Sequence, residues 1–73
     1  MQYKFKRHQQ VRLKSSPNAE YVEYHESFEG SSIKPGMKAK INLIMSNGQY
    51  HVEIFNDKDE LIAYALMHEE ELE

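Results

Sequence analysis

Apolar and polar residues alternate most clearly on either side of Asn47-Gly48. Residues 38–45 and 49–55 are strand-sized runs in which apolar side chains recur at every second position. An Asn-Gly pair between two such runs favours a type I′ turn, because both central residues of that turn need a positive φ. The pattern therefore predicts a β-hairpin over residues 38–55.

A two-residue turn also predicts the register of this hairpin. Ser46 would face Gln49, Leu43 would face Val52, and alternate side chains would point to one side of the sheet. The side chains expected to face the core are Ile41, Leu43, Met45, Tyr50, Val52 and Ile54. The other face is mostly polar, as in an antiparallel sheet that is packed on one side.

Residues 10–14 precede this hairpin and alternate apolar with basic side chains. Alternation over a span of this length predicts a first strand. We expect Val11 and Leu13 to point inward, and Arg12 and Lys14 to point to solvent.

A long connection, residues 15–36, follows that first strand and has two interpretations. A helix is one interpretation, because Ser16 suits its N-cap, Pro17 its first position and Gly30 the position just past its end. The tyrosine and valine residues between them favour extended backbone instead. We slightly favour an irregular loop and leave the helix open.

The stretch from residue 59 to residue 72 can also be read in two ways. It is rich in strong helix formers, and Asp59 suits a helix N-cap. In a helix, however, the glutamates at 69–71 would lie at the negative end of the dipole. The apolar run from Leu61 to Met67 is unbroken, as in a strand covered on both faces. We favour a strand and hence an all-β domain, with a C-terminal helix in an α+β domain as the alternative.

The predicted order of elements resembles that of small SH3-like β-barrels. The segments that carry the resemblance are Val11-Arg12-Leu13, Lys34-Pro35-Gly36-Met37, Tyr50-His51-Val52-Glu53-Ile54 and Glu70-Glu71-Leu72. The chain is similar to bacterial small-barrel families of unknown function. It also resembles barrels that serve as accessory subunits, such as the small stromal barrel of photosystem I and the variable chain of ferredoxin:thioredoxin reductase. The resemblance implies one barrel of about five antiparallel strands over residues 1–73, with a long loop after its first strand.

Two departures limit what this resemblance implies about function. Peptide-binding SH3 domains grip polyproline with a tryptophan, and this chain has none. Barrels that bind nucleic acid are usually basic, whereas the net charge here is −3. We therefore carry over a binding or accessory role without a specific ligand.

Size and cysteine content exclude several classes of protein. A domain of 73 residues has one thin core, and the absence of cysteine excludes disulfides and thiolate zinc sites. Residues 1–14 lack the apolar run of a signal peptide, and no segment has the length of a membrane span. We expect a cytoplasmic protein that does not associate with membranes.

Charge is distributed unevenly along the chain. Residues 1–14 contain five basic and no acidic side chains, whereas residues 57–73 contain seven acidic and one basic. Opposite charges on one small domain can simply neutralise each other. The alternative is a surface for nucleic acid or another polyanion, formed by Lys4, Lys6, Arg7, Arg12 and Lys14.

No residue pattern indicates catalysis, a cofactor or a metal. Among the four histidines, only His51 shares a strand face with a nearby carboxylate, Glu53, and two ligands are too few for a zinc site. The glutamates at 69–71 form a solvated run, whereas general acid–base catalysis needs a desolvated carboxyl. We therefore expect a protein that is not an enzyme and has no cofactor.

Three aromatic residues of the long connection, Tyr21, Tyr24 and Phe28, form the main candidate binding site. Aromatic side chains are favoured at protein interfaces. The simpler alternative is that these rings fold back and complete a thin core. We expect a non-catalytic module that binds another protein through these residues, with polyanion binding as the alternative.

Overall fold

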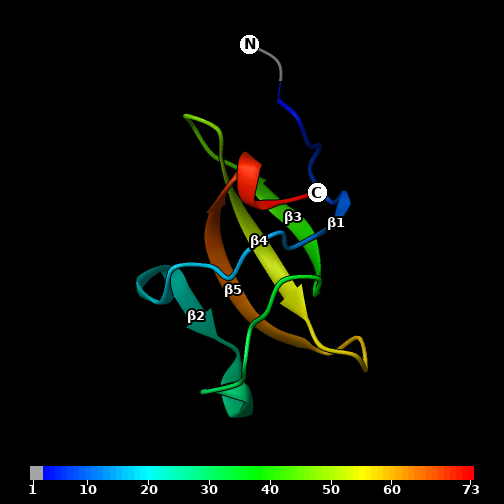
Figure 1. Cartoon of the computed structure of the whole chain (residues 1–73), viewed down its shortest axis with the longest axis vertical. Helices are drawn as coiled ribbons and strands as arrows, with labels where there is room; N and C mark the ends of the chain where they lie inside the picture. The colour runs from blue at the N-terminus through cyan, green and yellow to red at the C-terminus, as the bar shows by residue number, and fades with distance from the viewer. Residues whose placement is uncertain (1–2) are drawn as a thin grey trace.

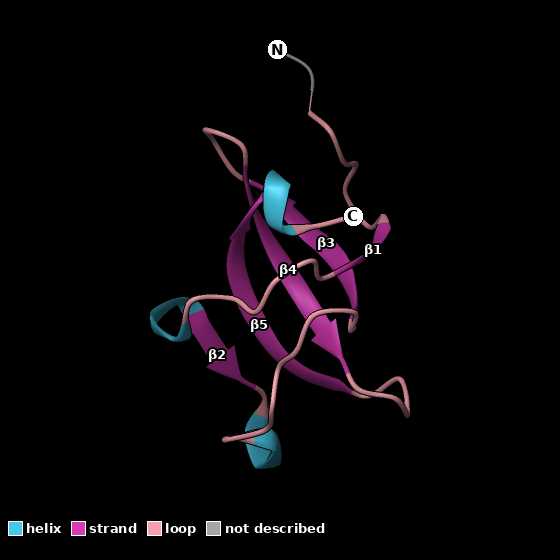
Figure 2. Ribbon diagram, viewed as in Figure 1, coloured by secondary structure: helices cyan, strands magenta, loops and turns pink. Residues whose placement is uncertain are grey.

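The computed structural model describes residues 3–73 and contains one sheet of five antiparallel strands. The strands are β1 (Gln10–Arg12), β2 (Val22–Tyr24), β3 (Lys38–Ile44), β4 (Gln49–Phe55) and β5 (Leu61–His68). Their order across the sheet is β1-β3-β4-β5-β2, and the three long strands form its curved centre (Figure 1). Three short 3₁₀ turns lie next to strand ends (Figure 2): η1 (Ala19–Tyr21), η2 (Glu26–Phe28) and η3 (Glu69–Glu71). The prediction of an all-β domain is confirmed.

The segment that could have formed a C-terminal helix is the longest strand, β5. It pairs with β4 on one side and with β2 on the other, so its backbone groups are bonded between strands. Ala63, Ala65 and Met67 are buried, while Tyr64 and Leu66 are half-buried on the other face. The α+β alternative is therefore wrong, and the unbroken apolar run reflects a strand partly covered on both faces.

The long connection does not form a helix either. Its interior consists of η1, the short edge strand β2 and η2. The side chain of Asn18 accepts a hydrogen bond from the N–H of Glu20 at 3.0 Å and caps η1. In β2, Val22 and Tyr24 lie opposite Ala65 and Ala63 of β5. The tyrosine and valine residues thus take the extended backbone that they favour.

The predicted turn at Asn47-Gly48 is confirmed. Both residues have left-handed backbone, with φ angles of 60° and 72°. The N–H of Gln49 donates to the carbonyl of Ser46 at 3.3 Å, as in a type I′ turn. This turn joins β3 to β4, the central strand of the sheet.

The predicted register of the hairpin is wrong, because the chain before the turn carries extra residues relative to β4. Beside the turn, the N–H of Met45 donates to the carbonyl of Gln49 at 2.9 Å, and Tyr50 lies opposite Ile44. A bulge farther along leaves Asn42 without a partner in β4. A turn motif fixes only the pairing at the turn, and each bulged residue shifts all the pairs beyond it.

These shifts decide which side chains of the hairpin face the core. Ile41, Tyr50, Val52 and Ile54 are buried as predicted. Leu43 and Met45, in contrast, are 44% and 37% exposed. Leu43 lies opposite His51 rather than Val52. Because successive strand residues point to opposite faces, one skipped residue is enough to turn Leu43 outward.

The core lies against the inner face of the sheet and is covered at one end by the segment before β1. It consists of Phe5, Val11, Leu13, Ala39, Ile41, Tyr50, Val52, Ile54, Ile62, Ala63, Ala65, Met67 and Leu72. The ring of Phe5 meets Tyr50 edge-on at 5.5 Å between centroids. The N–H of Phe5 also donates to the hydroxyl of Tyr50 at 3.2 Å. This bond ties the N-terminal segment to the core.

The strand ladders of residues 3–73 do not close into a barrel, since β1 and β2 are the two edges of the sheet. The end of the chain nevertheless returns to β1. Leu72 forms an isolated bridge with Leu13, and the backbones of Arg12 and Glu73 exchange two hydrogen bonds of 2.8 and 2.9 Å. Residues 12–14 of the basic segment therefore lie beside the acidic C-terminal residues 71–73 (Figure 1).

Candidate functional site

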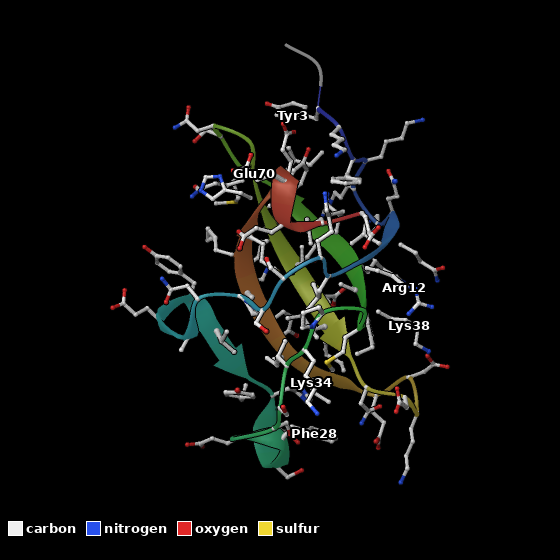
Figure 3. All side chains as sticks on the ribbon, in the orientation of Figure 1. Tyr3, Arg12, Phe28, Lys34, Lys38 and Glu70 are labelled. Carbon is white, nitrogen blue, oxygen red and sulfur yellow. The ribbon has the colours of Figure 1, made fainter. Side chains whose placement is uncertain are left out.

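The three aromatic residues predicted to bind a partner lie in different environments. Tyr21, at the end of η1, is 57% exposed. Tyr24 and Phe28 are half-buried and pack against the core. The hydroxyl of Tyr24 donates to the carbonyl of Ser31 at 3.0 Å, and Phe28 lies at the end of the molecule opposite Tyr3 (Figure 3). Of these three residues, Tyr21 alone presents more than half of its surface to solvent.

A row of apolar and aromatic side chains crosses the outer face of the sheet, the face opposite the core. Leu43, His51 and Leu66 lie directly opposite one another on β3, β4 and β5. Tyr64 projects from the same face of β5, and Tyr21 lines the same hollow as Tyr64. We call Tyr21, Leu43, His51, Tyr64 and Leu66 the outer patch. The exposed face of a sheet packed on one side is ordinarily polar, so this patch departs from the usual pattern.

Two contacts hold His51 at the centre of the outer patch. Nδ2 of Asn42 lies 3.0 Å from Nδ1 of His51, which suits an amide that donates to an unprotonated ring nitrogen. The imidazole also stacks on the ring of Tyr64, with centroids 5.5 Å apart and planes inclined by 22°. Asn42, the bulged residue of β3, and Tyr64 of the neighbouring β5 thus hold the imidazole of His51 from two sides.

A shallow hollow of about 350 Å³ lies within this patch, over β5 and between β2 and β4. It is lined by Glu20, Tyr21, Val22, Glu23, His51, Tyr64 and Leu66. Glu23 of β2 and Glu53 of β4 lie directly opposite Tyr64, one on each side. Among the described residues that line the hollow, none is Lys or Arg. The hollow therefore combines aromatic walls with negative charge.

The five basic residues predicted to bind a polyanion lie in two stretches. Lys4, Lys6 and Arg7 precede β1, Arg12 belongs to β1, and Lys14 follows it. Nε of Arg7 donates to the carbonyl of the bulged Asn42 at 3.1 Å. A guanidinium nitrogen of Arg12 donates to the carbonyl of Gly36 at 2.8 Å. Two of the five are thus partly engaged within the fold.

Arg12 lies directly opposite Lys38 in the β1–β3 ladder, and the two side chains project from the same edge of the molecule (Figure 3). Both line two hollows of about 480 and 470 Å³, which also share Phe55. The basic residues that line these hollows, which we call the basic edge, are Arg12, Lys34, Lys38 and Lys40. Asp57, Asp59 and Glu73 line them as well. Since Lys38 forms an ion pair with Asp59, the charge of this edge is mixed.

The histidines do not gather with other ligand-type side chains. In the part of the chain that the structure describes, no three His, Asp or Glu residues are placed to hold a metal ion. The same residues contain no helix that is long and apolar enough to cross a membrane. Comparisons with protein-family models, with curated proteins and with solved structures found no match to this chain.

Sequence reasoning identified one member of the outer patch, Tyr21, as a binding residue and missed the other four. Alternation assigns Leu43 to the core, because the bulge at Asn42 leaves no mark in the pattern. Tyr64 and Leu66 belong to an apolar run that covers both faces of β5. The spacing of Ala63, Ala65 and Met67 is the one available signal, since it places the residues between them on the outer face.

Proposed function

We propose that this protein is a non-catalytic binding module and that the outer patch binds another protein. The observation that carries the proposal is the row of Leu43, His51 and Leu66 across a face that is ordinarily polar. Aromatic side chains are enriched at the centres of protein interfaces, and tyrosine often dominates the binding energy. The stack of His51 on Tyr64 holds both rings before a partner arrives, which reduces the entropy lost on binding.

The proposal includes an SH3-like architecture and an accessory role in a larger assembly. Its support is the path of the chain: β1, β3, β4 and β5 follow in order, and Leu72 then returns beside Leu13. In small barrels of this kind, a closing strand after a short helical turn pairs with the first strand, and η3 occupies the place of that turn. The cytoplasmic location stays a prediction from the sequence.

A peptide selection tests the protein-binding function even though the partner is unidentified. Random heptapeptides displayed on phage would be selected on the immobilised protein and then measured against two folded variants. The outer-patch variant carries Tyr21→Ser with Leu43→Ser, two residues that are 57% and 44% exposed. The matched control carries Arg12→Gln with Lys38→Gln on the basic edge. Thermal unfolding of both variants establishes that each remains folded.

We expect the selected peptides to lose binding to the outer-patch variant and to bind the control as well as they bind the unaltered protein. Two results would contradict the proposal. One is a selection that enriches no peptide. The other is a set of peptides whose binding depends on the basic edge and not on the outer patch.

Polyanion binding is the second candidate function, and one observation favours it. The β1–β3 register places Arg12 directly opposite Lys38, an arrangement of like charges that is unfavourable unless an anion lies nearby. Asp59 already pairs with Lys38, which weakens the case for an external anion. If the basic edge binds nucleic acid, affinity for single-stranded DNA should fall steeply with salt and vanish in the Arg12→Gln, Lys38→Gln variant.

A further inference from the structure

The hollow in the outer patch has the composition of a site for a cation. Tyr21 and Tyr64 line it together with Glu20 and Glu23. The face of an aromatic ring is negative and attracts an ammonium or guanidinium group. Carboxylates beside such a ring add direct charge pairing. A cation in this hollow would therefore meet attraction from both its walls and its rim.

Among the residues that the structure describes, Glu20 and Glu23 of the hollow have no basic partner. Glu23 lies in β2, an edge strand whose one ladder neighbour is β5, and the residue opposite Glu23 is Tyr64. Within residues 3–73 neither Glu20 nor Glu23 forms an ion pair. On the far side of Tyr64, in contrast, Glu53 lies opposite Lys40. The unbalanced negative charge thus lies at the β2 side of the hollow.

The apolar part of the outer patch indicates which kind of cation the hollow binds. Leu66 lines the hollow, and Leu43, 44% exposed, continues the apolar surface beyond His51. A free inorganic cation would leave this surface uncovered. A cationic side chain on a polypeptide covers it, because side chains two positions along an extended segment point to the same face.

We propose that the hollow receives an arginine side chain from an extended segment of the partner protein. This assignment rests on the proposed protein-binding function. The planar guanidinium stacks on an aromatic face and pairs with a carboxylate at the same time, which the compact ammonium of lysine does less well. Tyr64, held by His51, provides the stacking face. Glu23, directly opposite Tyr64, provides the carboxylate. Apolar residues that flank the arginine contact Leu66 and Leu43.

Two short peptides test this assignment directly. The first is an acetylated and amidated pentapeptide, glycine-valine-arginine-valine-glycine, and the second replaces its arginine with neutral citrulline, which has nearly the same shape. Their affinities for the full chain would be measured by NMR titration at low salt. We expect the citrulline peptide to bind about threefold more weakly or worse, and the arginine peptide to weaken as salt is raised.

The variant Glu23→Gln removes the proposed carboxylate, and Glu29→Gln is its matched control, since Glu29 is exposed in the same connection but does not line the hollow. We expect Glu23→Gln to weaken the arginine peptide and to leave the citrulline peptide unchanged, while Glu29→Gln affects neither. Equal affinity for the two peptides, or equal effects of the two variants, would overturn the assignment.

The arginine assignment can fail while the proposed protein-binding function stands. If phage-selected peptides bind the outer patch but carry no arginine, the protein-binding function stands and the arginine assignment is overturned. If selected peptides do not use the outer patch at all, both proposals are overturned.

Discussion

Tyr64 of β5 stacks against His51 of β4, with ring centroids 5.5 Å apart, while its two chain neighbours, Ala63 and Ala65, are buried in the core. The same strand therefore supplies the inner packing and the proposed binding surface. Small residues inside and an aromatic residue outside suit a thin domain, because the core has little depth to fill. A change at Tyr64 acts on the outer patch and leaves the inward side chains of β5 in place.

Tyr21 and Tyr24 should differ sharply in their effect on stability. Tyr24→Ser removes a half-buried ring that packs on the core, so we expect it to lower the free energy of unfolding by about 1–3 kcal/mol. Tyr21→Ser removes an exposed ring and should change it by less than about 0.5 kcal/mol. Urea unfolding measures both values. Equal costs would mean that the two rings share one environment.

Ile41 and Leu43 provide the corresponding test of the hairpin register. Ile41 is fully buried and Leu43 is 44% exposed. Ile41→Ala should cost about 2–5 kcal/mol, as other large-to-small changes in cores do. Leu43→Ala should cost less than about 1 kcal/mol. If urea titrations give the larger cost to Leu43, the bulge at Asn42 is absent and Leu43 faces the core.

The hydroxyl of Tyr50 should stabilise the attachment of the N-terminal segment. Tyr50→Phe leaves the ring in the core but removes the acceptor of the Phe5 N–H. An unpaired buried donor costs about 1–3 kcal/mol, and amide hydrogen exchange at Phe5 should become faster. Tyr21→Phe, which removes an exposed hydroxyl, is the control. A Tyr50→Phe variant as stable as this control would show that the bond contributes nothing.

Gly48 should resist substitution for a conformational reason alone. Its φ is 72°, and a Cβ built there would meet only the side chain of Glu69, at 3.9 Å. Gly48→Ala should therefore cost about 1–2 kcal/mol through the left-handed backbone, and Gly48→Asn should cost less, since asparagine tolerates this conformation. Thermal unfolding of both variants checks the order. Equal costs would indicate a steric cause instead.

The sequence was sufficient to predict the features that depend on local chemistry. The Asn47-Gly48 turn follows from the positive φ that both positions require, and the inward orientation of Val11 and Leu13 follows from simple alternation. The strand at Leu61–His68 could be predicted because glutamates beyond it oppose a helix dipole. Each of these properties belongs to a few adjacent residues.

The remaining features depend on pairing between distant segments. Asn42 and Ile62 are skipped in their ladders, and nothing in their own sequence context indicates a bulge. The burial of Tyr24 depends on how the long connection returns to the core, which the sequence left open between core and surface. Leu43 was assigned to the core for this reason, since only the bulge at Asn42 turns it to the outer face.

The central claim is that the outer patch is the binding surface, and a map of amide chemical shifts during titration tests it most directly. Phage-selected heptapeptides would be added to the ¹⁵N-labelled protein. We predict that the amides of residues 20–23, His51 and residues 64–66 shift together, while those of residues 10–12 and 38–40 stay in place. Shifts confined to the second group would contradict the account and assign binding to the basic edge.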